Sequence, residues 1–332
     1  MRKRKKWRSK KNIKKIIISV IIIIFLLLLA KFNILNTNTV NTISSTLGFE
    51  NIINFEEKSV KENTELIENV SKSIKIEPNK LNILYLDVGQ ADSELIIYKD
   101  KTILIDAGNR SDGELIVNGI KALGISKLDY VIGTHIHEDH LGGMSDIVNS
   151  FEIGEYYMPY NTTTTASYYE NLLESLSDKQ ENINKASIGD RFSIDDITCE
   201  IMCVDNNDPD DANEASIVLQ INYGAQKYLF MGDAVEKNEE ERNWEDIDVL
   251  KVGHHGSDTS SSKKFLNQIL PEIAIIPVGE NNSYNLPKET IINRFENIGT
   301  KIYRTDQDGT IQILSDGNSN EVIKIDVSFD GN

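Results

Sequence analysis

The sequence predicts an α/β protein in which helices cover sheets, rather than an all-β barrel. Short apolar segments bounded by turn residues recur from Leu81 onward, as is typical of buried strands. Segments with helical spacing lie between them, and one of these ends at Gly124, a residue suited to cap a helix. With 332 residues, the chain is long enough for one large domain with appendages, or for two domains at most.

The individual elements follow from the same patterns. Strands are predicted at residues 81–88, 94–98, 102–105, 129–135, 197–204, 216–222, 228–231, 249–252, 273–278, 310–314 and 322–327. Helices are predicted at residues 115–123, 141–148, 166–176, 261–269 and 288–298.

Charge is distributed very unevenly along the chain. The first 15 residues contain ten Lys or Arg and no acid, so the remaining residues carry 25 basic and 52 acidic side chains, a net charge of −27. A body this acidic has no general electrostatic footprint for nucleic acid or anionic lipid, and it attracts divalent cations.

Residues 16–30 form an uninterrupted apolar segment next to this basic head. As a helix they span roughly 22 Å, short of the ~30 Å hydrocarbon core, but flanking Lys14, Lys15 and Lys31 can extend their charged ends to the membrane surface. No small-x-small cleavage site follows Ala30, which favours an uncleaved anchor over the alternative, a secretory signal peptide. The positive-inside rule then predicts a single-pass cell-membrane protein whose body is extracellular.

Three regions are therefore predicted. Residues 1–35 form the basic head and membrane anchor, residues 36–78 form a polar spacer, and residues 79–332 form the folded domain.

All five histidines fall in two clusters, each directly after a predicted strand. The first cluster contains His135, His137, Asp139 and His140, and the second is His254-His255. Neutral imidazole and carboxylate groups are good ligands for a borderline divalent cation. His135 and His137 can face one ion, and Asp139 with His140 can face a second ion about 3.5–4 Å away.

Other strand ends add further candidates. Asp233 follows a strand and could bridge two cations. Asp87 and Asp106 also precede glycines at strand ends, where they either form turns or orient the histidines. Gly142-Gly143 either breaks a helix or lets the backbone pass close to the ligands.

Together these motifs resemble the metallo-β-lactamase superfamily. H-I-H-E-D-H followed by L-G-G is similar to the family signature H-x-H-x-D-H. L-D-V-G-Q-A-D-S, L-I-D-A-G, M-G-D-A and V-G-H-H-G-S, in this order, resemble the hydrolase domain of ComEC-type DNA-uptake proteins and its stand-alone relatives, which include secreted phosphorylcholine esterases. The resemblance covers residues 81 to about 315.

The resemblance implies an αββα sandwich with the site at one edge of its two sheets, and two divalent metals, zinc or alternatively manganese. The implied metal ligands are His135, His137, Asp139, His140, Asp233 and His254. Asp139, Asp233 and His255 are the implied catalytic groups, although the resemblance does not decide which of His254 and His255 is the ligand. No other cofactor site is predicted.

One motif departs from the family. Where the family commonly has N-x-Y-G-H-P, this chain has Asn282-Ser-Tyr-Asn-Leu-Pro287, so Leu286 stands in place of a histidine. Leucine cannot bind a metal, so the second ion should be held more weakly unless water, Asn285 or His255 takes its place.

The predicted function is hydrolysis of a small-molecule or nucleic-acid phosphodiester by a metal-bound hydroxide. Two alternatives stay open: a non-catalytic surface module that keeps a metal for stability, which Leu286 favours, and a β-lactam or other amide hydrolase. The sequence indicates a membrane contact through residues 16–30 and identifies no protein partner.

Overall fold

The computed structural model describes residues 63–160, 163–206, 211–240 and 242–331. The chain divides into two compact units, 1–64 and 65–332. The predicted anchor at 16–30 lies outside the described residues. None of the helices within the described part is long and apolar enough to cross a membrane.

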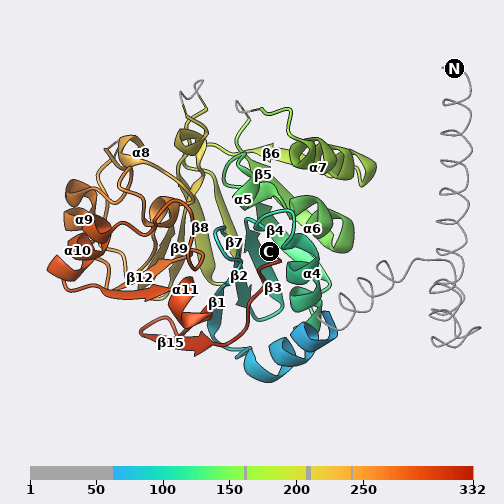
Figure 1. Ribbon diagram of the computed structural model, residues 1–332, viewed down its shortest axis with the longest axis horizontal. Helices are drawn as coiled ribbons and strands as arrows, with labels where there is room; N and C mark the ends of the chain where they lie inside the picture. Colours follow the sequence, from blue (N-terminus) through green and yellow to red (C-terminus); the bar gives the residue numbers. More distant parts are fainter. Residues whose placement is uncertain (1–62, 161–162, 207–210, 241, 332) are drawn as a thin grey trace, which may run out of the picture. The chain divides into compact units, whose positions relative to one another are not determined.

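The second unit is built on two sheets (Figure 1). In spatial order, the eight-stranded sheet contains β15 (Asn320–Ile325), β14 (Thr310–Ser315), β1 (Leu81–Tyr85), β2 (Glu94–Tyr98), β3 (Lys101–Ile105), β4 (Lys127–Ile132), β5 (Glu152–Met158) and β6 (Ile183–Lys185). The seven-stranded sheet contains β13 (Lys301–Arg304), β12 (Ile273–Ile276), β11 (Val249–Lys251), β10 (Gln226–Phe230), β9 (Val218–Tyr223), β8 (Ile197–Cys203) and β7 (Arg191–Ile194).

Helices cover the outer face of each sheet (Figure 1). Over the first sheet lie α4 (Gly113–Ala122), α5 (Glu138–Leu141), α6 (Met144–Ser150), α7 (Ser167–Asp178) and a helix at 63–73. The other helices are α8 (Glu236–Glu240), α9 (Lys263–Ile269), α10 (Glu289–Asn297), α11 (Thr305–Asp308) and the short 3₁₀ segments η1 (Ala212–Ala215) and η2 (Gly253–Gly256). The predicted α/β arrangement of sheets covered by helices is confirmed.

Strand periodicity produces the layers. In β1 the alternate residues Leu81, Ile83 and Tyr85 face the core between the two sheets, whereas Leu84 faces the core beneath the helices. Both faces of β1 are buried because successive strand residues point to opposite sides of a sheet that is covered on both.

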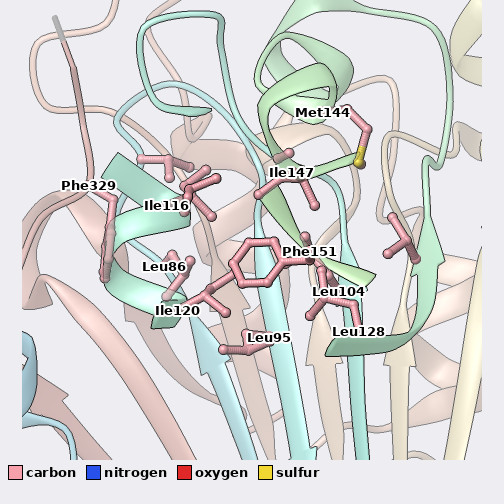
Figure 2. Packing of buried hydrophobic residues seen from close by; sticks show 14 of the residues in the cluster. Leu86, Leu95, Leu104, Ile116, Ile120, Leu128, Met144, Ile147, Phe151 and Phe329 are labelled. Atoms are coloured by element: carbon pink, nitrogen blue, oxygen red, sulfur yellow. The ribbon is translucent and has the colours of Figure 1, made fainter. Parts of the chain in front are cut away.

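The C-terminal segment returns to the first sheet and closes its helical core. Phe329 is buried beside Ile116 and Ile120 of α4 (Figure 2). A Cβ atom on Gly119 would lie only 2.1 Å from Cε1 of Phe329, so α4 needs glycine there to accept the ring. Phe329 of the C-terminal segment is therefore part of the core.

Several elements are absent from the sequence-based prediction, including β5, β6, β7 and β13. β6, β7 and β13 are short strands of three or four residues. β5 carries Gly154, whose Cβ would meet the carbonyl oxygen of Asp129 at 2.3 Å, and glycine weakens a strand pattern. The helix at 63–73 falls inside the predicted spacer, and it buries Leu66 and Val70 against the first sheet.

Candidate metal centre

The first group of site residues follows β4 of the first sheet. His135 is fully buried in the loop after the strand, and His137 immediately precedes α5, which carries Asp139 and His140. Nε2 of His135 lies 3.0 Å from Nδ1 of His137. The predicted cluster is thus held on a strand end and the first turn of a helix.

Glycine allows the chain to pass this cluster closely. A Cβ on Gly142 would lie 2.4 Å from the backbone nitrogen of Arg110, and one on Gly143 would lie 2.4 Å from the carbonyl oxygen of Ala107. Both contacts are with backbone, so no larger residue fits without moving a loop. Close packing beside the histidine loop is therefore the role of the L-G-G motif.

The second group comes from the other sheet. Asp233 follows β10 and is almost completely buried, and His254 and His255 form η2 directly after β11. Both histidines have left-handed backbones, with φ of 49° and 50°. Consecutive non-glycine residues in this region are strained, and such strain is concentrated at functional sites.

Asp233 lies between two sets of histidines. Its Oδ2 is 4.0 Å from Nε2 of His135 and 3.7 Å from Nε2 of His254. Its Oδ1 is 3.4 Å from Nε2 of His140.

His255 belongs with His140, because Oδ2 of Asp139 lies 3.3 Å from Nε2 of His255 and 3.9 Å from Nε2 of His140. Nε2 of His255 is also 3.8 Å from Oδ2 of Asp233. His254 and His255 therefore both face the centre, on its two different halves.

The chemistry of these donors fits a divalent cation. Nε2 of His140, Oδ1 of Asp233 and Nε2 of His255 are buried and form no hydrogen bond within the described residues. Buried polar atoms of this kind normally have a partner. One ligand atom from each of Asp92, His140, Asp233 and His255 falls within 4.8 Å of the others. A cation would satisfy these buried donors together.

Neighbouring groups fix the orientation of each ring. Nδ1 of His140 donates to Oδ2 of Asp106 at 2.7 Å, and Asp106 also accepts from the backbone nitrogen and the hydroxyl of Thr134. Nδ1 of His255 donates to the carbonyl oxygen of Pro277 at 2.9 Å. Each ring thereby keeps its Nε2 facing the centre.

A buried ion pair lies beneath the histidines. Lys251, on β11, donates from Nζ to Oδ2 of Asp92 and to the carbonyl oxygen of Gly232, the latter at 2.9 Å. The other Asp92 oxygen, Oδ1, is 3.3 Å from Nδ1 of His255. Asp92 thus connects Lys251 of the second sheet to the half of the centre that contains His255.

The buried carboxylates around His140 have the largest effect on the protonation of the centre. Burial opposes a charge on His140, but Asp233, Asp106 and Asp139 raise its pKa well above the usual value. Burial likewise opposes the charge on Asp233, but His140 and His255 lower its pKa well below the usual range. Burial, followed by the charge of His140, lowers the pKa of His135. The carboxylate of Asp233 is therefore ionised and suited to a cation.

A cavity of about 340 Å³ opens onto the centre. It is lined by Gln90, His137, Glu138, Asp139, Asp233, His254, His255, Tyr284 and Leu286. Leu286 therefore lies at the site, as the motif alignment requires, although it offers no donor.

Asp87 and Asp106, whose roles the sequence left open, have different roles in the structure. Asp106 orients His140, whereas Asp87 forms a turn in which its Oδ1 accepts from the backbone nitrogen of Gly89. Asp92 and Lys251 were not predicted as site residues. Asp92 stands within the L-D-V-G-Q-A-D-S motif, which was the available signal, but Lys251 is 159 positions away and only the fold brings the two together.

Comparison with known proteins decides the family. The model of the metallo-beta-lactamase superfamily matches residues 86–280. The chain belongs to this superfamily. The two sheets with outer helices are the mixed α/β architecture that the resemblance implied.

Three curated relatives are similar to this chain over about two thirds of its length. ComE operon protein 3 of Bacillus subtilis (strain 168) is 29% identical over 68% of this chain and 32% of its own length. Competence protein ComA of Neisseria gonorrhoeae is 30% identical over 70% of this chain and 32% of its own length. Recombination protein 2 of Haemophilus influenzae is 31% identical over 69% of this chain and 28% of its own length. The resemblance to ComEC-type proteins is confirmed, and the matched region spans about a third of these relatives.

Proposed function

We propose that this chain is a metal-dependent hydrolase that cleaves a phosphodiester at the outer face of the cytoplasmic membrane. The observation that carries the proposal is the position of Asp233 between two sets of histidines at the floor of a cavity. Family membership supports hydrolysis, and the likeness to ComEC-type proteins motivates the phosphodiester.

Two divalent cations, zinc or alternatively manganese, would be held by the two sets. One set comprises His135, His137, His254 and Asp233, and the other comprises Asp139, His140, His255 and the shared Asp233. When bound, such ions supply a water nucleophile at neutral pH and neutralise charge on a phosphoryl oxygen.

The chain itself contributes orientation and exclusion of water. Asp106 and Pro277 fix the His140 and His255 rings, and the almost complete burial of Asp233 keeps its carboxylate from solvent. Fixed dipoles in a buried site stabilise developing charge without reorganising.

The decisive experiment combines metal analysis with hydrolysis of bis-p-nitrophenyl phosphate by the full chain. His135→Ala with His137→Ala should remove bound metal and activity while circular dichroism stays near wild type, because the sheets carry the stability. Asn171→Ala on α7 serves as a folded control. Equal metal content in the double variant and wild type would show that the site is assigned wrongly.

A non-catalytic metal-binding module is the second candidate, and the presence of Leu286 in the cavity wall favours it. A wild-type chain that holds two ions yet hydrolyses neither bis-p-nitrophenyl phosphate nor a β-lactam would establish this alternative.

A further inference from the structure

The cavity above the metal centre is small. Its volume of about 340 Å³ is close to the lower end of the 300–1,000 Å³ typical of small-molecule sites. A polynucleotide would have to contact surfaces beyond this cavity through several consecutive phosphates.

Among the described residues, the cavity walls carry carboxylates and imidazoles. Glu138, Asp139 and Asp233 line it, and its lining contains neither lysine nor arginine. Two basic residues contact the lining, but both have partners. Nε of Arg110 is 2.6 Å from Oε1 of Glu138, and Nζ of Lys288 donates to the carbonyl oxygen of Tyr284 at 2.8 Å. Proteins that bind nucleic acid use Lys and Arg to neutralise several phosphates, and these walls offer no such series.

One wall is aromatic and apolar. Tyr284 is 65% exposed, although it lines the cavity, and Leu286 beside it packs partly against the core of the second sheet. The side chain of Asn282 holds this wall in place. Its Oδ1 accepts from the backbone nitrogen of Leu286 at 3.0 Å, and its Nδ2 donates to the carbonyl oxygen of Leu286 at 2.7 Å. The residue that replaces a family histidine is therefore a fixed apolar surface.

We infer that the substrate is a small phosphodiester with a single charged phosphate, whose non-leaving group is uncharged and planar and lies against Tyr284 and Leu286. This inference rests on the proposed hydrolysis and specifies its substrate. An aryl or nucleobase group stacks on an exposed aromatic ring, and an adjacent leucine adds apolar contact. A polynucleotide is disfavoured because the described lining residues include no lysine or arginine that could neutralise consecutive phosphates.

Two model diesters with the same leaving group test the inference in the zinc-loaded full chain. Bis-p-nitrophenyl phosphate retains an aryl non-leaving group, and methyl p-nitrophenyl phosphate replaces it with a methyl group. The aryl diester should have the higher kcat/KM by roughly tenfold, and Tyr284→Ala should remove most of this preference. Leu286→Ala should reduce it more weakly.

Leu270→Ala is the matched control. Leu270 is also an exposed leucine, at 51%, but it precedes β12, whereas the metal centre follows the other ends of β10 and β11. The control should keep the wild-type preference. Equal kcat/KM for the two diesters in wild type, or an unchanged preference in Tyr284→Ala, would overturn the inference.

Binding without turnover separates this inference from the proposed function. Phenylphosphonate should bind the zinc-loaded chain roughly tenfold more tightly than methylphosphonate, and Tyr284→Ala should abolish the difference. This result in a chain that hydrolyses neither diester would sustain the aryl site and refute the hydrolase.

Displacement of phenylphosphonate by a 16-residue oligothymidylate tests the exclusion of polynucleotides. Displacement is measured because the basic residues 1–15 could bind DNA away from the site. Failure of the oligonucleotide to compete is expected. Effective competition, or cleavage of the oligonucleotide at a rate similar to that of the aryl diester, would contradict the inference.

Discussion

Leu286 stands where the sequence resemblance predicts a histidine. It lies in the cavity wall, and Asn282 holds its backbone from both sides. His255 stands 3.3 Å from Asp139, so the second half of the centre keeps two imidazoles without a histidine at 286. Of the three substitutes considered from the sequence, His255 is therefore the one for which the structure gives a direct contact.

Introducing the family histidine should strengthen the second ion. Leu286→His places an imidazole on a wall whose backbone is already fixed, and changes in ligand environment alter metal affinity by roughly ten- to a hundredfold. A chelator titration should remove the second ion at a higher chelator concentration from this variant than from wild type. Leu270→His, at the opposite end of the sheet, should behave like wild type. Superimposable curves for Leu286→His and wild type would mean that residue 286 does not reach the ions.

The Asp92–Lys251 pair should be indispensable as a pair. Lys251→Met removes the lysine partner of the buried Asp92 carboxylate, and breaking a buried pair in this way costs about 3–5 kcal/mol. Urea denaturation of the single variant should show this loss. Asp92→Asn combined with Lys251→Met should recover a large part of it, because no charge is left unpaired. A single variant as stable as wild type would refute the assigned pairing.

The sequence could predict the part of the centre whose ligands lie close together along the chain. His135, His137, Asp139 and His140 lie within six residues, and such a concentration of ligand types is visible without a structure. Asp92 and Lys251 could not be found this way, because a lone aspartate and a lone lysine have ordinary roles until a fold pairs them. The facing directions of His254 and His255 were also inaccessible, since they depend on two left-handed backbones.

At the scale of elements, the C-terminal segment and α4 depend on each other. Phe329 occupies space that exists only because residue 119 has no side chain. Strand and helix patterns do not reveal such a contact, because it joins residues 210 positions apart outside any sheet register. The long buried strands, by contrast, were predictable, because each is recognised from a short run of apolar residues that are adjacent in the sequence.

Phe329→Ala should destabilise the protein by about 3–5 kcal/mol, the usual cost of removing a buried aromatic ring. Thermal or urea unfolding of the variant measures this. Val322→Ala on the edge strand β15, where the side chain is only partly buried, should cost much less. A loss for Phe329→Ala no larger than that of the control would mean that the C-terminal segment does not stabilise the helical core.

At the scale of the whole molecule, the orientation across the membrane is still a prediction. The ten basic residues at 1–15 and the apolar segment 16–30 predict a folded unit outside the cytoplasm. Protease added to intact cells should therefore remove the hydrolase body, and the same treatment of lysed cells gives the complete digest for comparison. A body that is protected in intact cells and cleaved only after lysis would reverse the orientation.

The pairing of β1 with β14 also determines when the centre can form during the life of the protein. β1 begins at Leu81, and its antiparallel partner at Thr310–Ser315 is synthesised long after it. The two groups of site residues belong to different sheets, and the sheet that carries the first group is incomplete until that late strand arrives. A growing chain consequently has no finished ion site before Thr310–Ser315 has been made, so loading of the complete centre has to follow the synthesis of this strand.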